Sequence, residues 1–318
     1  MSKNQNITVL GVFVADTTYR ADRSPRMGET ILGNSFALGP GGKGSNQAVA
    51  AARIGGDVTI LTQLGDDAFA GMAERTWLEA GVKSAARRNP ANYTGAAYIF
   101  VEESSGDNAI IICPGAAGDI GIDDIEANAG LIRSSKVFVT QLEQPLVAAE
   151  RGLQTAREAG VITILNPAPA PKQPLDESIL ALCDFITPNE TEAQELTGLP
   201  VETVDDARLA ANRLLELGVG AAIITLGGQG ALLHSSEMSV HVPALSAGKV
   251  VETTGAGDAF NGGLAVGLAR GLAPIDAVKL GCATAGISVT RPGAAASMPS
   301  QSEVEALLAS AIKEKDYE

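Results

Sequence analysis

The sequence predicts an α/β fold organised around a mainly parallel sheet, and two observations support this. Short apolar runs rich in β-branched residues recur, and each ends in polar, proline or glycine residues, as in KVFVTQLE, VITILNPAPAP, CDFITPNETE and AAIITLGGQG. The run VTILTQLGDDAF precedes a helical stretch at about 68–80, which gives a β–α unit. Because ligands of such sheets bind at the carboxyl ends of the strands, we expect the polar endings to form the site.

The composition bounds the size and the partners of the protein. The 318 residues, 45% of them hydrophobic, suffice for one large core, so we expect a single domain over 1–318. The net charge of −14 argues against nucleic acids and anionic membranes as partners. Cys113, Cys183 and Cys282 are far apart and odd in number, which predicts reduced core residues and a cytoplasmic protein. The polar start MSKNQN, and apolar runs shorter than about 18 residues, predict neither export nor a membrane span.

The first apolar run is ITVLGVFVAD, at 7–16. Its β-branched composition predicts one short buried strand. Asp16 is the first polar side chain after the apolar residues, so it is a candidate for the site at the end of that strand.

Two hairpins in the first third of the chain predict a small β-sheet lid. The stretch after Asp16 carries mixed charge and short alternating patterns, which favour an exposed hairpin. GAAYIFV at 95–101 and NAIIIC at 108–113 are separated by the polar segment EESSGD, which predicts a second hairpin. We expect this lid to be inserted at about 15–40 and 93–115 of the chain.

A glycine cluster opens an alanine-rich helix after the first hairpin. Gly39, Gly41 and Gly44 match the dinucleotide-binding spacing G-x-G-x-x-G, and Asp66 lies at a suitable distance, so a nicotinamide-dependent enzyme is one alternative. Against this alternative, that fingerprint should directly follow the first buried strand.

The same cluster can instead be interpreted as a site for a small polar ligand. Gly41 and Gly42 would let the ligand approach the backbone, while Lys43, Asn46 and Gln47 offer donors from a helix start. A helix preceded by a flexible loop, without any ligand, is the third interpretation.

The segment ETTGAGDAFNGG, at 252–263, combines an anion site with a base. Helix starts present free N–H groups and partial positive charge, so Gly255, Ala256 and Gly257 could bind a phosphate through the backbone. Asp258 would lie in the first turn, where the positive end favours its ionised form and a role as general base. Phosphoryl transfer to an alcohol requires this combination. The alternative is an aspartate that only stabilises a helix start after a tight turn.

Polar residues also close the later strands. Asn189 and Glu192 straddle a helix start, where they could hold a hydrated magnesium ion or act only as a helix cap. The other residues at these strand ends are Glu143, Asn166, Glu190, Thr225, Gly227, Gly228 and Gly230. The chain contains no Walker motif and no protein-kinase signature set, so a nucleotide would be held in another way.

Five ordered motifs carry a family resemblance that covers nearly the whole chain. They are GGKGSNQAVAAARIG, NPAPA, TPNETEAQELTG, ITLGGQGALL and TTGAGDAFNGG. In this order and at these intervals they resemble the ribokinase-type branch of the PfkB family of carbohydrate kinases. The resemblance implies a three-layer αβα domain with a small β lid, which usually pairs with a second lid in a homodimer. It also implies transfer of the γ-phosphoryl group of Mg-ATP to the 5-hydroxyl of a pentose, D-ribose in the first instance.

The resemblance further implies roles for individual residues. Asp258 would take the hydroxyl proton, and the backbone of Gly255, Ala256 and Gly257 would form the anion hole. The implied sugar-site positions are Val14, Asp16, Gly42, Lys43, Asn46, Glu143 and Asp258. The implied nucleotide contacts are Asn189, Thr225, Gly227, Gly228, Gly230, Gly257 and Cys282. Glu192 would act on magnesium through water, and the implied potassium positions are Glu252, Thr254, Ser288, Arg291, Gly293 and Ser297.

Two positions depart from the family pattern. Val14 stands where ribokinases have a sugar-binding asparagine, and an unpaired buried sugar hydroxyl would cost about 1–3 kcal/mol there. The preferred sugar could therefore lack that hydroxyl or carry it in another configuration. Glu252 replaces the aspartate that is usual at the potassium site, so potassium could bind there, shift or be lost.

The leading hypothesis is therefore an ATP-dependent pentose kinase that works by positioning, a general base and electrostatic stabilisation. The alternatives are a kinase for 2-deoxyribose, another sugar or a nucleoside, and a sugar-binding sensor without turnover.

Overall fold

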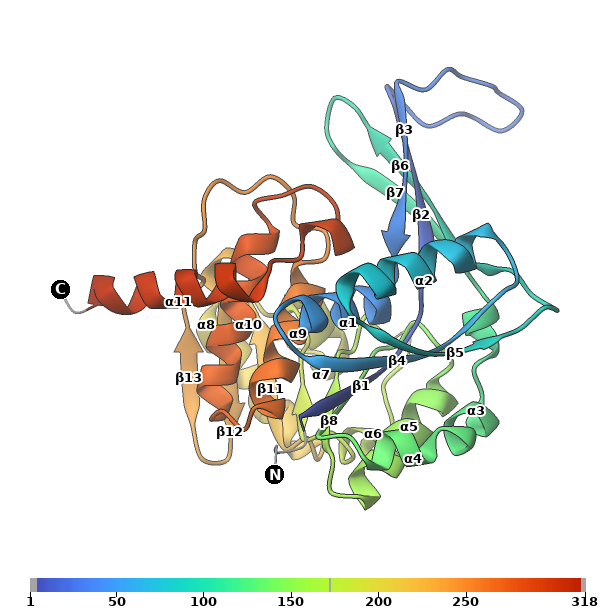
Figure 1. Cartoon of the computed structure of the whole chain (residues 1–318). Coiled ribbons are helices and arrows are strands. Elements are labelled where there is room, and N and C mark those ends of the chain that lie inside the picture. Colours follow the sequence, from blue (N-terminus) through green and yellow to red (C-terminus); the bar gives the residue numbers. More distant parts are fainter. Residues whose placement is uncertain (1–4, 172, 316–318) are drawn as a thin grey trace.

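The computed structural model describes residues 5–171 and 173–315, and within them nine strands form one large sheet (Figure 1). Its order is β13-β12-β11-β10-β9-β8-β1-β4-β5. All neighbours from β5 to β11 are parallel, and β12 and β13 add an antiparallel edge. The strands are β1 (Asn6–Leu10), β4 (Asp57–Leu64), β5 (Lys83–Arg88), β8 (Val137–Thr140), β9 (Ile162–Leu165), β10 (Phe185–Ile186), β11 (Ala221–Thr225), β12 (Ala231–Ser235) and β13 (Ser239–Val242). The predicted α/β class with a mainly parallel sheet is confirmed.

Helices cover both faces of this sheet because its strands are apolar on both sides. In β8, Val137 and Val139 belong to one buried cluster, whereas Phe138 belongs to the other. The first cluster includes residues of α1 (Lys43–Arg53), α2 (Ala68–Ala80), α9 (Ala256–Ala269), α10 (Pro274–Ser288) and α11 (Gln301–Lys315). The second includes residues of α3 (Ile122–Ala127), α4 (Ala129–Arg133), α5 (Leu146–Glu158), α6 (Glu177–Leu180), α7 (Glu190–Thr197) and α8 (Val204–Glu216). Three short 3₁₀ helices complete the described chain, η1 (Ala116–Asp119), η2 (Gly227–Gln229) and η3 (Ala295–Ser297).

A separate four-stranded sheet, the lid, projects from the main body (Figure 1). In the described part of the chain its strands are β2 (Val14–Ala21), β3 (Ser35–Gly41), β6 (Thr94–Glu102) and β7 (Asn108–Gly115), in the order β3-β2-β6-β7. Each hairpin is antiparallel, and β2 and β6 join the two hairpins as a parallel pair.

The prediction of one strand over 7–16 is wrong, because this run crosses between the two sheets. β1 ends at Leu10, and Asp16 lies in lid strand β2. At the crossing the backbone passes the start of α1, where a Cβ added to Gly11 would lie 2.7 Å from Gly44 Cα. Both halves of the run are apolar, so composition alone does not reveal the break.

The crossing also excludes the dinucleotide interpretation. Gly39 and Gly41 lie in lid strand β3, where they pair with Asp16 and Val14 of β2. A dinucleotide fingerprint would instead occupy the turn from a strand of the main sheet into a helix.

The assignment of all three cysteines to the core is wrong for one of them. Cys183 and Cys282 are buried, but Cys113 is exposed on β7. Other elements cover less of the lid sheet than of the main sheet, so apolar lid residues stay exposed. Among the described residues, no helix is both long and apolar enough to cross a membrane.

Candidate active site

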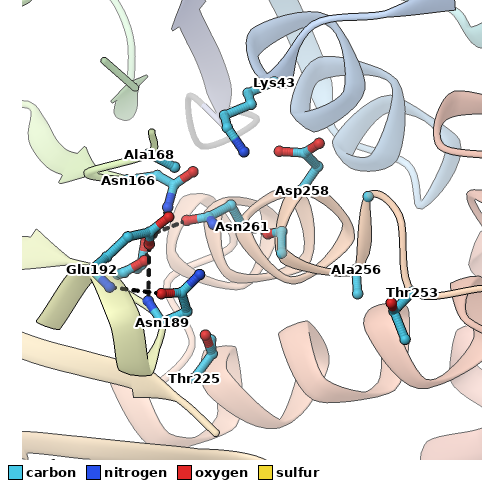
Figure 2. A pocket seen from close by; sticks show the side chains of 13 residues that line it. Lys43, Asn166, Ala168, Asn189, Glu192, Thr225, Thr253, Ala256, Asp258 and Asn261 are labelled. Atoms are coloured by element: carbon cyan, nitrogen blue, oxygen red, sulfur yellow. Dashed lines mark hydrogen bonds between the residues drawn. The ribbon is translucent and has the colours of Figure 1, made fainter. Parts of the chain in front are cut away.

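A cavity of about 210 Å³ lies at the carboxyl ends of the main-sheet strands, at the start of α9 (Figure 2). Lys43 and Asp258 lie on one side of it, and Asn189, Glu192 and Thr225 on the other. Its lining includes eight of the predicted site residues, Lys43, Asn189, Glu192, Thr225, Gly255, Ala256, Gly257 and Asp258. It also includes Asn166, Ala168, Thr187, Thr253 and Asn261.

Asp258 lies in the first turn of α9, as predicted, but its carboxylate does not cap that helix. Asn46 Nδ2 donates to Oδ2 at 3.0 Å, and Gln47 Nε2 donates to Oδ1 at 3.1 Å. Both donors come from α1, and the Asp258 residue is only 7% exposed. The carboxylate is therefore oriented by side chains of a second helix, which a simple helix-start role does not require.

The two glycines before Asp258 have different structural roles. Gly255 has a φ of 77°, and a Cβ there would lie 3.0 Å from Ala294 Cβ, so the turn itself requires glycine. At Gly257 a Cβ would meet no atom within 4 Å. The space beside Gly257 is thus open, and the first-turn N–H groups of α9 can receive an anion there.

Lys43 is the counter-charge for several carboxylates. Burial lowers its pKa, but the charges of Asp258, Glu143 and Glu192 outweigh burial and hold the pKa above its ordinary value. The ammonium therefore stays charged at neutral pH, where it can stabilise an added phosphate.

For the carboxyl groups of the site, burial has the largest effect on the pKa. Burial raises the pKa of Glu143 to about 7, against the Lys43 charge, and burial with the Asp258 charge raises the pKa of Asp16 to about 6. Burial likewise raises the pKa of Asp258 and Glu192 above ordinary values. The helix start was expected to favour ionised Asp258, but the desolvation of this buried carboxylate has the larger effect and raises its pKa.

Most of the sugar-site positions meet near the base of the lid. A Cβ on Gly41 would lie 2.1 Å from Asp16 Oδ2, so the Asp16 carboxylate folds against bare backbone. Glu143 Oε2 accepts from the Lys43 backbone N–H at 2.8 Å. Asn46 Oδ1 is buried without a hydrogen-bond partner, which leaves an acceptor for a ligand hydroxyl.

Gly42 and Val14 complete this side of the site. Gly42 is the N-cap of α1 with a φ of 88°, and a Cβ there would lie 2.5 Å from Val12 O. Val14 is 3% exposed, and its Cγ1 would be 2.9 Å from a Cβ on Gly95. Val14 precedes Asp16 by two residues in β2, so the two side chains share one face of the lid.

The nucleotide side begins with a helix cap. Asn189 Oδ1 accepts from Glu192 N at 2.8 Å, and Glu192 Oε2 accepts from Asn189 N at 2.9 Å, which is the capping box of α7. The cap interpretation is therefore correct, yet both side chains also line the cavity. Glu192 is 8% exposed, and as a carboxylate in the cavity wall it could hold a magnesium ion through water.

The remaining predicted nucleotide positions do not all lie at the cavity. A parallel bridge joins Thr225 to Asn189. Gly227, Gly228 and Gly230 form the following turn, in which Gly228 has open space around it. Cys282 does not line the cavity: it is buried in α10, and burial raises its thiol pKa to about 12.

The predicted potassium positions come from three segments: Glu252 and Thr254 precede α9, Ser288 ends α10, and Arg291, Gly293 and Ser297 follow α10. Most of their polar groups already have partners. Glu252 Oε2 accepts from Gly293 N at 2.9 Å, and Arg291 forms an ion pair with Glu303. Ser288 Oγ and Ser297 Oγ donate to carbonyls of their own turns. Thr254 is exposed. Among the described residues, no three His, Cys, Asp or Glu side chains gather as a metal cluster. A cation there would thus depend on Glu252 and backbone oxygens.

Sequence reasoning missed Thr187, Thr253 and Asn261. Thr187 is the polar residue that closes the short strand β10, so the strand-end rule could have found it. Asn261 lies three residues after Asp258, on the same side of α9, where helical spacing could have found it.

Together, an open helix start, a buried and oriented carboxylate and a charged lysine at the carboxyl ends of parallel strands define an α/β phosphotransferase. The family model described as pfkB family carbohydrate kinase matches residues 4–301, and the chain belongs to this family of carbohydrate kinases. The predictions of this family and of a phosphotransferase are confirmed.

The relatives include kinases for two different pentoses. The chain is 38% identical over 296 residues to a deoxyribokinase of Salmonella typhimurium, with 93% of this chain and 96% of that protein covered. It is 35% identical over 300 residues to a ribokinase of Haemophilus influenzae, with 94% and 97% covered. The solved Arabidopsis thaliana ribokinase complexed with ribose and ATP superposes with a TM-score of 0.86 at 30% identity, covering 95% of this chain and 98% of that chain.

The raised pKa of Glu143 gives a stability prediction. The folded state prefers the protonated form, so this contribution is full below pH 4.5 and is lost as pH rises through about 7. Glu143→Gln keeps an acceptor for Lys43 N but cannot ionise. Urea denaturation measures the free energy of unfolding of the variant and of the wild type. The variant's advantage should be about 1–2 kcal/mol larger at pH 8 than at pH 5. The exposed Glu195→Gln is the control, and a gain independent of pH would contradict the prediction.

Proposed function

We propose that this kinase transfers the γ-phosphoryl group of Mg-ATP to the 5-hydroxyl of a pentose, with D-ribose as the leading acceptor and D-ribose 5-phosphate and ADP as products. The observation that carries this proposal is the buried Asp258 carboxylate, held by two amide donors beside the open start of α9. A base and an anion site at one place suit phosphoryl transfer to an alcohol.

The chemistry follows from this arrangement. Asp16, Lys43, Asn46 and Glu143 hold the sugar hydroxyls, with Gly42 leaving room for the ring. The reacting O–H donates to Asp258, and as the oxygen bonds to phosphorus the proton passes to that carboxylate while the bond to ADP breaks. First-turn N–H groups at 255–257 and the Lys43 ammonium stabilise the phosphoryl oxygens during the transfer.

The nucleotide and its ions take the other side of the cavity. Asn189, Thr225 and the turn Gly227, Gly228, Gly230 bind ATP. Glu192 would hold magnesium through water, and the ion would supply positive charge against the phosphates. Glu252 and nearby backbone oxygens would hold potassium, which predicts faster ADP release in potassium than in sodium; equal rates would remove potassium from the proposal.

Asp258→Asn tests the base directly. The amide cannot take the proton, so we expect kcat for ADP release to fall by about 10²–10⁴-fold while sugar binding and the thermal midpoint change little. Asp276→Asn is the matched control, since Asp276 also lies third in its helix but is exposed and paired with Lys279. If the wild type shows no turnover, and Asp258→Asn keeps sugar binding and signalling, the protein is instead a sensor.

A second candidate acceptor is 2-deoxy-D-ribose, and Val14 favours it. The Val14 side chain is buried on the same lid face as Asp16 and can neither donate nor accept a hydrogen bond. A sugar hydroxyl desolvated there would lose its partners, whereas a deoxy position would not. The similarity to a deoxyribokinase supports this candidate.

Val14→Asn tests the substrate preference. If position 14 faces the distinguishing hydroxyl, the ratio of kcat/KM for D-ribose to kcat/KM for 2-deoxy-D-ribose should rise about tenfold in the variant. Val14→Ala is the control, because it adds space without adding an amide. A ratio that is equal in all three proteins would show that Val14 does not set the specificity.

We also propose that the lids of two copies pair. Tyr19, Phe36, Leu38, Tyr98 and Ile111 lie on one lid face by strand register, and each is at least 37% exposed. Tyr19 stacks against Phe36 and Tyr98, with ring centroids 5.1 and 5.5 Å away. Such an apolar face is typical of an interface.

Phe36→Lys should convert the dimer to a monomer, because it places a charge on this apolar face, in edge strand β3 beside Tyr19. Light scattering during size-exclusion chromatography measures the mass. Leu209→Lys, at a similarly exposed position of α8, should leave the mass of a dimer unchanged. A monomeric wild type would remove the proposal.

A further inference from the structure

Gln47 is a buried residue of α1 that touches the base but does not line the cavity. It is 1% exposed, and both ends of its amide have partners. Its Nε2 donates to Asp258 Oδ1 at 3.1 Å and to Asn166 Oδ1 at 3.0 Å, while its Oε1 accepts from Gln141 Nε2 at 2.7 Å. A substrate in the cavity would therefore meet Gln47 only through its neighbours.

A backbone carbonyl fixes the direction of these hydrogen bonds. Asn166 Nδ2 donates to Thr187 O at 3.0 Å, and a carbonyl oxygen can only accept. The oxygen of the Asn166 amide must then face Gln47, and Gln47 must donate to it through its N–H group. Gln47 consequently presents a donor, never an acceptor, to Asp258.

The same threonine also holds the start of α9. Thr187 Oγ1 donates to Asn261 Oδ1 at 2.7 Å, and Asn261 Nδ2 donates to Gly257 O at 2.8 Å. Asn261 lies in the wall of the cavity beside Asp258 (Figure 2). A continuous path thus connects Asp258, through Gln47, Asn166, the carbonyl and hydroxyl groups of Thr187, and Asn261, to the Gly257 carbonyl in the first turn of α9.

We propose that Gln47 is a positioning residue: it fixes the orientation of the Asp258 carboxylate relative to the anion site, an inference that rests on the proposed role of Asp258 as base. With Gln47 on Oδ1 and Asn46 on Oδ2, the carboxylate cannot rotate, and its remaining lone pairs are held for the substrate hydroxyl. Loss of the Gln47 donor frees that rotation and removes a hydrogen bond that favours the ionised form.

The other charges around Asp258 come from four different elements. Lys43 belongs to α1, Asp16 to β2, Glu192 to α7, and Glu143 to the segment after β8. A substitution of Gln47 leaves all four in place. A shift in the pH profile of that variant therefore reports the lost donor rather than a changed charge.

Gln47→Met removes the amide at nearly constant volume. We expect kcat to fall about tenfold, the rising limb of kcat against pH to move up by about 0.5–1 unit, and KM for sugar and ATP to stay within about twofold. The control is Gln63→Met, since Gln63 is also buried and donates to a carboxylate, Asp124 Oδ2, at 2.8 Å. Gln63→Met should lower the free energy of unfolding but leave kcat and its pH profile unchanged.

Gln47→Glu is the second variant and has a distinct signature. When protonated it can still donate to Asp258, but when ionised it repels that carboxylate, so its kcat should decline at high pH where the wild type is flat. The proposal is overturned if Gln47→Met keeps the kcat and pH limb of the wild type, or, should that variant not fold, if Gln47→Glu is active and flat from pH 6 to 8. Asp258→Asn separates the two levels: its full activity would refute the base itself, whereas its inactivity beside unchanged Gln47 variants would refute only the positioning.

Discussion

The close contact between α1 and α9 is the constraint on which the site depends. A Cβ on Gly262 of α9 would lie 2.6 Å from Ala50 Cβ of α1, so glycine and alanine let the two helices approach to backbone distance. That approach brings Asn46 and Gln47 within hydrogen-bond reach of Asp258. The alanine-rich composition of α1 is therefore a requirement of the chemistry as well as of packing, because larger side chains would separate the donors from the base.

The balance of charge follows from the same burial. Four acidic side chains share the neighbourhood of one ammonium, and desolvation raises the pKa of each acid. In the absence of ligands such a site holds protons that a solvated site would release. Under the proposed function, the cation that accompanies the nucleotide would supply positive charge there, and the sugar hydroxyls would supply hydrogen bonds.

The sequence was sufficient for the fold class and for the start of α9, because both depend on local signals: β-branched runs with polar endings, and glycines before an aspartate at a helix start. It failed at 7–16, where one apolar run serves two sheets and only the close approach of Gly11 to Gly44 marks the crossing. It also missed the hydrogen bond between Thr187 and Asn261, because local patterns could have placed each residue at the site but do not encode a contact between separate elements.

The crossing at Gly11 divides the proposed site between the lid and the main domain. Val14 and Asp16 belong to the lid, whereas Asp258 and its donors belong to the main domain. Under the proposed roles, a substitution in the lid would change which acceptor is held and would leave the residues of phosphoryl transfer in place.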